Sequence, residues 1–243
     1  MKHATSFLII LALVMTLGTA RAGSIKVGPF VVSHLYHASV WIRYTGDKQP
    51  LNIAVDPWSK ATFPRGHAAD LIFITDVHFD HFDPPAIRRV ASPRAVIVAP
   101  PAVAREGRTK LKSYTWRVLK NGESATLKAI HIRTIPMYNT SEDRIQYHPQ
   151  GRGNGYILQS GQTAIYIAGD TQCTPEMKNL KNIDLALIPI NLPYTMDARE
   201  AASCVAAFRP KRVMPYHFAI GDANPELFKR LVQKIQGVSF VQP

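Results

Sequence analysis

The chain has 243 residues, of which 46% are hydrophobic and 19% charged, and its formal net charge is +12. This composition is typical of a globular protein and excludes a disordered chain, a collagen-like fibre and a heptad coiled coil. The two cysteines, Cys173 and Cys204, are too few for a disulfide-rich scaffold or a four-cysteine zinc site. The length allows one large domain or two small ones, and either buries a complete core.

Residues 1–22 have the features of a secretory signal peptide. Lys2 gives a positive start, residues 7–17 form an 11-residue run that is apolar except for one threonine, and Ala20-Arg21-Ala22 is a small-x-small cleavage site. A transmembrane anchor is the alternative, but the run is too short to span a bilayer. We therefore predict cleavage after Ala22, a single domain over residues 23–243, export to the periplasm or the medium, and no membrane anchor in the mature chain.

Export would permit a disulfide bond between Cys173 and Cys204, because extracytoplasmic compartments oxidise thiols. Cys173 is expected in a loop and Cys204 inside a helix, 31 residues further on. Such a pair is weak evidence for a bond, and two unpaired, partly buried thiols are the plainer interpretation. The sequence leaves the pairing open.

The first half of the chain predicts strands followed by a helix. Alternation over Val40–Tyr44 indicates a strand, and Leu51–Val55 returns beside it after a turn. The apolar runs Leu71–Thr75 and Ala95–Ala99 are typical of strands buried on both faces. Between these two runs, Asp83 followed by two prolines predicts the start of a helix.

The second half continues with strands and helices. Two strands, over 155–159 and 163–168, are predicted to form a hairpin. An apolar stripe over 198–208 predicts a helix capped by Thr195 or Asp197. The remaining predicted elements are strands over 126–135, 185–190, 212–216 and 238–241 and a helix over 224–235. Strands thus cluster in two groups, each followed by helices, which predicts two packed sheets with helices outside in one α/β domain.

Four side chains that can bind a metal follow the strand over 71–75 within six residues: Asp76, His78, Asp80 and His81. Loops at strand ends are where α/β proteins place their sites. Ionisable groups beside a core are costly when unpaired, and a cation removes that cost. We therefore predict a metal site here, in preference to a cluster that is merely solvent-exposed or hydrogen-bonded.

Asp170 and His217 are two further candidates, because each directly follows or closely follows an apolar strand. Either residue alone could be an ordinary turn residue or cap. Three strand ends carrying such residues in one domain support one another, and together they favour a shared site.

The order Thr-x-x-His-x-Asp-His, Gly-Asp-Thr and Pro-x-His resembles the metallo-β-lactamase fold superfamily. It is most similar to the branch of metal-dependent hydrolases that includes the ascorbate-6-phosphate lactonase-like proteins. The resemblance extends over almost the whole mature chain and implies a four-layer αββα sandwich with a two-metal site at one edge. Among the similar stretches are His37-Ala38, Val55-Asp56-Pro57, residues 75–83, Tyr147 to Gly151, Gly169-Asp170-Thr171 and Pro215-Tyr216-His217.

The resemblance also implies ligand roles by position. His78 belongs to the first metal, whereas Asp80, His81 and His217 belong to the second. Asp170 bridges the two metals. These assignments make the second site the more complete one.

The first site departs from the pattern of the superfamily. Asp76 replaces the usual first histidine, and the usual histidine before the bridging aspartate is not evident. Its expected ligands are Asp76, His78 and Asp170, and Asn139 or His148 could complete the site. A carboxylate in place of an imidazole suits harder ions such as Mn²⁺ better, but the general order of affinities still favours Zn²⁺. We therefore expect Zn²⁺ first, with one or two ions per chain, and Mn²⁺ or another divalent cation second.

The expected reaction is hydrolysis. Bound divalent ions lower the pKa of water to about 7, and the resulting hydroxide attacks a carbonyl or phosphorus. Asp80 and Asp170 are expected to orient the water and accept its proton. Tyr138, Asn139 and His148 are assigned to substrate contact, with simple packing of their loop as the alternative. His37 lies either near the site or in the core.

Residues 88–120 hold nine basic side chains and one acidic one. A solvated basic face is the first interpretation, and attraction of anionic substrates is the second. We expect a small anionic ester, lactone or phosphoester as substrate and no nucleic-acid partner, because no aromatic-basic module is visible. The alternatives are a metal-binding protein of the same fold with weakened catalysis and an exported nuclease or phosphodiesterase. The oligomeric state is left open.

Overall fold

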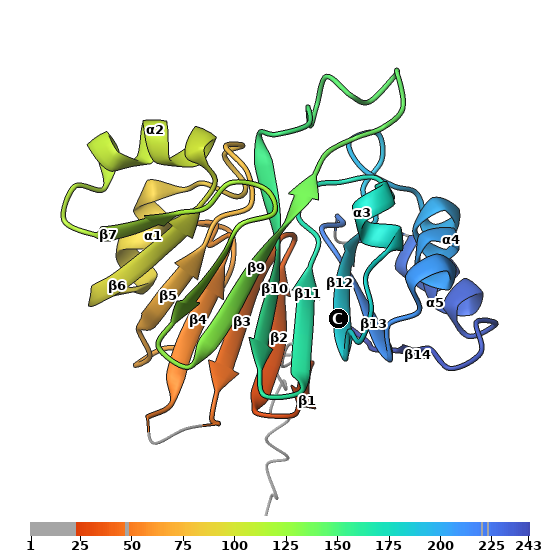
Figure 1. Cartoon of the computed structure of the whole chain (residues 1–243), viewed down its shortest axis with the longest axis horizontal. Helices are drawn as coiled ribbons and strands as arrows, with labels where there is room; N and C mark the ends of the chain where they lie inside the picture. The colour runs from red at the N-terminus through yellow and green to blue at the C-terminus, as the bar shows by residue number, and fades with distance from the viewer. Residues whose placement is uncertain (1–22, 47–48, 220, 223) are drawn as a thin grey trace, which may run out of the picture.

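Two seven-stranded sheets pack face to face, and helices cover their outer faces (Figure 1). This computed structural model describes residues 23–46, 49–219, 221–222 and 224–243. The predicted signal peptide, residues 1–22, lies outside the described residues. None of the helices in the described part of the chain combines the length and the apolar character that a membrane span needs.

The N-terminal sheet contains its strands in sequence order. They are β1 (Ser24–Val27), β2 (Phe30–Tyr36), β3 (Ser39–Tyr44), β4 (Leu51–Val55), β5 (Ala69–Phe73), β6 (Ala91–Ala99) and β7 (Thr115–Val118). Neighbours from β1 to β4 are antiparallel, and neighbours from β4 to β7 are parallel. Because parallel strands end at the same edge, the connections after β4 and β5 leave the sheet side by side.

The C-terminal sheet has the order β14-β13-β12-β11-β10-β9-β8. Its strands are β8 (Ser124–Leu127), β9 (Ile130–Met137), β10 (Gly153–Ser160), β11 (Thr163–Ile167), β12 (Leu185–Pro189), β13 (Arg212–Tyr216) and β14 (Ser239–Phe240). Neighbours from β8 to β11 are antiparallel, and those from β11 to β14 are parallel. The connections after β11, β12 and β13 therefore also leave from one edge.

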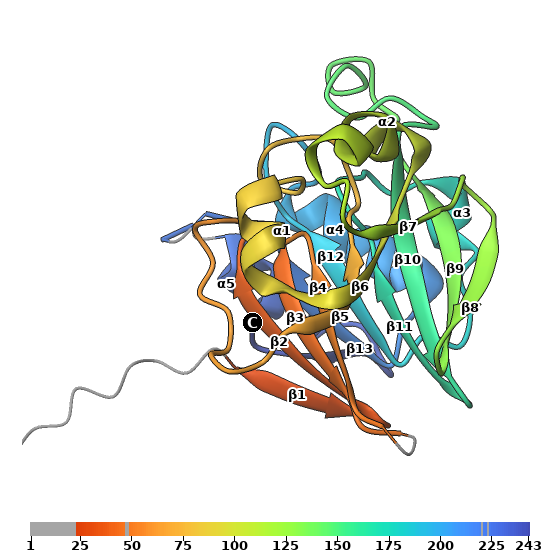
Figure 2. The same cartoon turned by 90° about the vertical axis from the view of Figure 1, so that its left-hand side faces the viewer.

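Helices complete the four layers. Apolar residues of α1 (Pro84–Val90) and α2 (Pro101–Lys110) pack on the N-terminal sheet, in front of it in Figure 2. Those of α3 (Pro175–Lys178), α4 (Ala198–Phe208) and α5 (Asn224–Val232) pack on the C-terminal sheet. A third core, containing Phe73 and Tyr156, fills the space between the sheets. The predicted αββα sandwich is confirmed.

Some elements differ from the predicted ones. The strand predicted over 126–135 is two strands, β8 and β9, because Lys128 adopts a left-handed conformation (φ 54°) in the turn between them. Asp197, rather than Thr195, caps α4: its carboxylate accepts hydrogen bonds from the backbone of the first turn, and its own N–H donates to the Glu200 carboxylate. The last helix ends at Val232, before the predicted residue 235.

Cys173 and Cys204 form a disulfide, so the interpretation of two unpaired thiols is wrong. Cys173 lies three residues after Asp170, and Cys204 lies on the buried side of α4. The bond therefore ties the connection after β11 to the helix that covers the sheet behind it.

Removing this disulfide should destabilise the protein strongly. The bond closes a loop between residues separated by 31 positions, and the chain-entropy relation gives about 3–4 kcal/mol for a loop of that size. The Cys173→Ala/Cys204→Ala variant should therefore unfold at a lower urea concentration than the oxidised wild type. Reduced wild type serves as the matched control and should unfold with the variant. Coincident unfolding curves for the oxidised protein and the variant would contradict the prediction.

Candidate metal centre

Three buried side chains from three strand ends meet at the shared edge of the two sheets. His81 follows β5, Asp170 follows β11 and His217 follows β13. Nε2 of His81 lies 3.1 Å from Oδ2 of Asp170, and Nε2 of His217 lies 3.1 Å from Oδ1 of the same carboxylate. The two imidazole nitrogens are 3.1 Å apart. These atoms are close enough to bind one ion together.

Asp56 fixes the orientation of His81 from behind. Its Oδ2 accepts a hydrogen bond from Nδ1 of His81 at 2.9 Å and another from the Thr75 hydroxyl at 2.6 Å. Its Oδ1 accepts from the Thr75 backbone N–H at 2.8 Å. Because Asp56 holds the proton on Nδ1, the Nε2 that faces Asp170 is the nitrogen of His81 that can lose its proton to bind a metal, as in carboxylate–histidine–metal arrangements.

The role of Asp56 was missed from the sequence, where Val55-Asp56-Pro57 is noted only as a stretch similar to the superfamily. The available signal is an aspartate immediately after the fully buried end of β4. Asp56 also has a positive φ of 43°. This uncommon conformation turns the chain at the point where the carboxylate must face β5.

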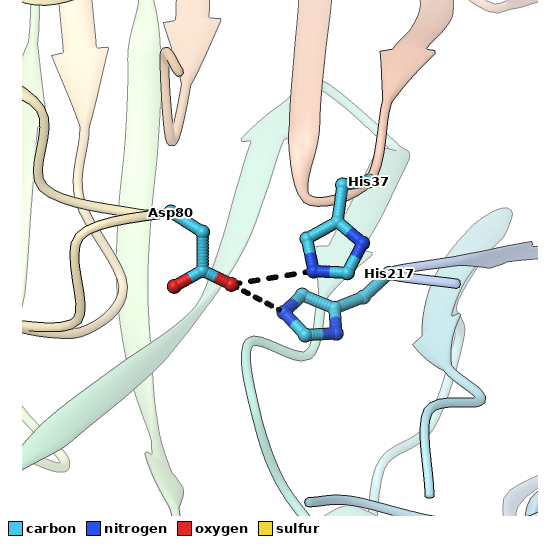
Figure 3. A group of neighbouring side chains, drawn as sticks. All are labelled: His37, Asp80 and His217. Atoms are coloured by element: carbon cyan, nitrogen blue, oxygen red, sulfur yellow. Dashed lines mark ion pairs between the residues drawn. The ribbon is translucent and has the colours of Figure 1, made fainter. Parts of the chain in front are cut away.

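Asp80 faces two histidines at the wall of the site (Figure 3). Its Oδ2 lies 3.2 Å from Nε2 of His37 and 3.4 Å from Nε2 of His217. His37 stands in the turn between β2 and β3, and its Nδ1 donates to the Phe218 carbonyl at 3.2 Å. The lone pair of its Nε2 therefore faces a carboxylate oxygen, and a proton or a cation between them removes the repulsion. His37 thus lies at the site, one of the two positions considered for it.

The charges of the cluster suit a cation. Burial opposes ionisation of Asp170, but His217 and His81 hold the pKa of this carboxyl well below its usual range. Burial likewise disfavours protonated His81, but Asp170, Asp56 and Asp80 raise the pKa of its imidazole well above the ordinary value. Oδ1 of Asp170 is buried and accepts no hydrogen bond. This orphaned oxygen among imidazole nitrogens is what a divalent ion satisfies, so the residues fit a metal.

A second group of donors lies beside the first. Nδ1 of His148 lies 3.1 Å from the Tyr194 carbonyl oxygen, and its Nε2 lies 3.1 Å from Oδ2 of Asp170. Asp76 and His78 are close to one another, with Oδ2 and Nδ1 3.2 Å apart. Of the two residues considered for completing the first site, the structure brings His148 and not Asn139 among the donors.

Tyr138 and Asn139 do not lie at the cavity, in contrast to the predicted substrate contacts. The Tyr138 hydroxyl donates to Glu176 at 3.0 Å. The buried Asn139 amide donates to the backbone carbonyls of Arg144 and Tyr194 at 2.9 and 2.7 Å. Both side chains therefore hold the connection between β9 and β10 in place.

That connection, residues 138–152, is fixed to the body of the protein. The side-chain oxygen of Gln172 accepts from the backbone N–H groups of Thr140 and Ser141. Arg144 forms two hydrogen bonds of 2.8 Å with the carboxylate of Glu200 on α4. A rigid loop of this kind can present His148 with a defined orientation.

A cavity of about 380 Å³ opens above the donors. It is lined by His37, Trp58, His78, Phe79, Asp80, Tyr147, His148, Asp170, Asn191, Tyr194 and His217. Trp58 and Phe79 form one aromatic pair, with ring centroids 5.9 Å apart, and Tyr147 and Tyr194 form another at 5.1 Å. A larger hollow of about 600 Å³ beside α3 lies over the outer face of the C-terminal sheet, away from these donors.

Comparison with known proteins agrees with this geometry. The family model described as a beta-lactamase superfamily domain matches residues 32–217. A UPF0173 metal-dependent hydrolase of Thermococcus kodakarensis is 33% identical over 224 residues, which cover 87% of this chain and 96% of the relative. One of Pyrococcus horikoshii is 32% identical over 227 residues, with the same coverage of both chains.

Solved structures show the same architecture. The crystal structure of a putative metal-dependent hydrolase from Parabacteroides distasonis superposes with a TM-score of 0.79 at 36% identity and covers 91% of this chain and 97% of its own. A metallo hydrolase from Ignicoccus hospitalis has a TM-score of 0.72 at 24% identity, with 88% and 94% coverage, and supports the fold alone. The chain therefore belongs to the beta-lactamase superfamily, has the metallo-β-lactamase fold and is a member of its metal-dependent hydrolases.

Proposed function

We propose that this protein is an exported hydrolase that holds a divalent metal ion on His81, Asp170 and His217 and cleaves a small ester or lactone. The observation that carries the proposal is the convergence of buried imidazole and carboxylate atoms, with Oδ1 of Asp170 left without a donor, at the floor of a cavity. Zn²⁺ is the first choice of ion, because two imidazoles and a carboxylate are donors that zinc accepts.

A divalent ion in such a site supplies Lewis acidity: it lowers the pKa of water and polarises the oxygen of a carbonyl. The protein supplies orientation. Although burial opposes it, His81, together with hydrogen bonds from His217 and His37, holds the pKa of Asp80 well below its usual range, so this carboxylate stays ionised. Asp80 then orients a water molecule, while Nε2 of His37, 3.2 Å away, can hold a proton at the cavity wall.

The walls of the cavity favour an uncharged, apolar substrate. Two aromatic pairs flank the donors, and no lysine or arginine is among the described residues that line the space. Lys60 lies outside this lining, with its ammonium 4.5 Å from the centre of the Trp58 ring. The basic residues of 88–120 belong to α1, β6, α2, β7 and their connections rather than to the lining. The aromatic rings can sandwich a flat or aliphatic group of the substrate.

The disulfide supports the export part of the proposal. Structural disulfides persist in oxidising compartments such as the periplasm and the medium and are rare in the cytosol. The bond between Cys173 and Cys204 is therefore in keeping with the signal peptide predicted over residues 1–22.

Purified, zinc-loaded protein should hydrolyse 4-nitrophenyl butyrate faster than its hemisuccinate analogue and faster than bis(4-nitrophenyl) phosphate. Phe79, whose side chain is 75% exposed at the mouth, should contribute binding. Phe79→Ala should raise KM about 5–10-fold with little change in kcat, the equivalent of burying part of one aromatic ring. Ile145→Ala is the matched control, because Ile145 is 48% exposed in the nearby loop but does not line the cavity. Preference for the phosphodiester, or no turnover by metal-loaded protein, would overturn the proposal.

A further inference from the structure

The buried carboxylate of Asp76 already has a cationic partner. Nε of Arg152 donates to its Oδ1 at 2.9 Å, and Nη2 donates to its Oδ2 at 2.6 Å. The backbone N–H of Val77 donates to Oδ1 as well, at 2.8 Å. Both oxygens of Asp76 are therefore satisfied, whereas Oδ1 of Asp170 in the neighbouring group is not.

The guanidinium is held in this position by its own surroundings. Nη2 of Arg152 also donates to the Tyr147 carbonyl, within the same loop. The loop turns at Gly151, which has a φ of 86°, and Arg152 then leads directly into β10. Only 21% of the arginine side chain is exposed. A planar fork on a carboxylate is the geometry for which arginine is suited, and it gives a stronger pair than a lysine would.

The same guanidinium obstructs the neighbouring histidine. Nη2 of Arg152 lies 3.2 Å from Nε2 of His78, while Nδ1 of the same ring lies 3.2 Å from Oδ2 of Asp76. An ion bound to both Asp76 and His78 would have to stand beside a fixed positive charge. Mutual repulsion and the loss of the bidentate pair would both oppose its binding.

We infer that Arg152 takes the place of one of the two cations of the fold, so that the chain binds a single tight metal ion, at His81, Asp170 and His217. Asp76 is then a charge partner of Arg152 rather than a ligand. His148 contacts Asp170 directly, with its Nε2 3.1 Å from Oδ2. The inference rests on the metal site of the proposed function but not on its substrate.

Metal counting tests the inference without any activity measurement. The full chain is stripped of metal, titrated with Zn²⁺ alone, desalted and analysed for zinc per chain. Wild type should retain one ion. Arg152→Gln, which frees Asp76 and His78, should retain two. Arg152→Lys keeps a positive charge at this place and should stay near one ion.

Arg144→Gln is the matched control, because Arg144 belongs to the same loop and pairs with a carboxylate, Glu200, that is not among the metal donors. It should retain one ion. If Arg152→Gln fails to fold with Asp76 unpaired, Asp76→His combined with Arg152→Gln removes the lone buried carboxylate and supplies an imidazole, and this double variant should hold two.

Two outcomes would overturn the inference alone: two tight ions in wild type, or a single ion in every folded variant that lacks Arg152. No retained zinc in wild type would overturn the metal site of the proposed function together with the inference. One ion in wild type without hydrolysis of any ester leaves the inference supported and counts against the proposed function only.

Discussion

The Asp170→Asn variant is expected to fold, to lose its metal and to lose at least about 10²-fold in hydrolytic rate, the order of magnitude seen when one preorganised transition-state contact is removed. The Asp170 carboxylate, which is 2% exposed, contacts the imidazoles of His81, His148 and His217. An amide has nearly the same shape but no charge and one coordinating oxygen instead of two. The attraction that holds a cation beside the imidazoles of His81 and His217 is therefore lost, whereas the packing of the sheet edge is kept.

The measurement pairs zinc content with turnover, and circular dichroism establishes that the variant is folded. Asp143→Asn is the control for the same chemical change, because the Asp143 side chain is 74% exposed and its charge partner is Arg144. It should keep the metal and the rate. A folded Asp170→Asn variant with full zinc and the wild-type rate would remove Asp170 from the site.

The residues at the centre of the candidate site could be predicted from the sequence because they follow the ends of strongly apolar strands. Asp80 and His81 follow one buried strand, and Asp170 and His217 follow two others. The carboxyl ends of parallel strands lie at one edge of the sheet, irrespective of the conformation of the loops. The grouping of these four side chains therefore followed from strand prediction and from the resemblance, and the structure brings them together.

The residues around that centre were beyond a single sequence. Asp56, His37 and Arg152 act through contacts with residues 25, 181 and 76 positions away in the chain, and no periodicity specifies such pairs. Conversely, closeness in sequence to a site residue led to a wrong assignment. Tyr138 and Asn139 stand in the loop that carries His148, but their side chains turn to Glu176 and to backbone carbonyls instead of the cavity.

The fold was predicted best where elements are buried on both faces. Strands such as β5 and β12 are continuous apolar runs and were found. The edge strand β7 alternates between exposed and half-buried residues, and α3 is a single turn, so neither has a pattern long enough to identify. The helix α2 was missed because it buries only Val103, Ala104 and Gly107 along ten residues rich in charge.

Asp56→Asn should weaken zinc binding about 10–100-fold, the usual effect of losing the hydrogen-bond partner of a metal-binding histidine. Asparagine tolerates the positive φ of 43° at this position, so the backbone need not change. Oδ1 of Asp56 faces the Thr75 N–H, and Oδ2 faces both the Thr75 hydroxyl and Nδ1 of His81. Both carboxylate oxygens of Asp56 therefore accept hydrogen bonds. Asparagine has only one such oxygen, so its NH₂ group replaces the other and must face a group that now donates.

The amide will meet its partners best when its oxygen accepts from the Thr75 backbone and its NH₂ donates to Nδ1 of His81. His81 then carries its proton on Nε2, the atom that should bind the metal, and zinc must displace that proton. Zinc affinity measured by competition with a chelator tests this directly. Asp70→Asn is the control: Asp70 is a partly buried carboxylate on the same strand, β5, and it accepts from the Asn52 backbone, away from the donors. Unchanged affinity in a folded Asp56→Asn variant, with Asp70→Asn also unchanged, would show that Asp56 does not set the tautomer of His81.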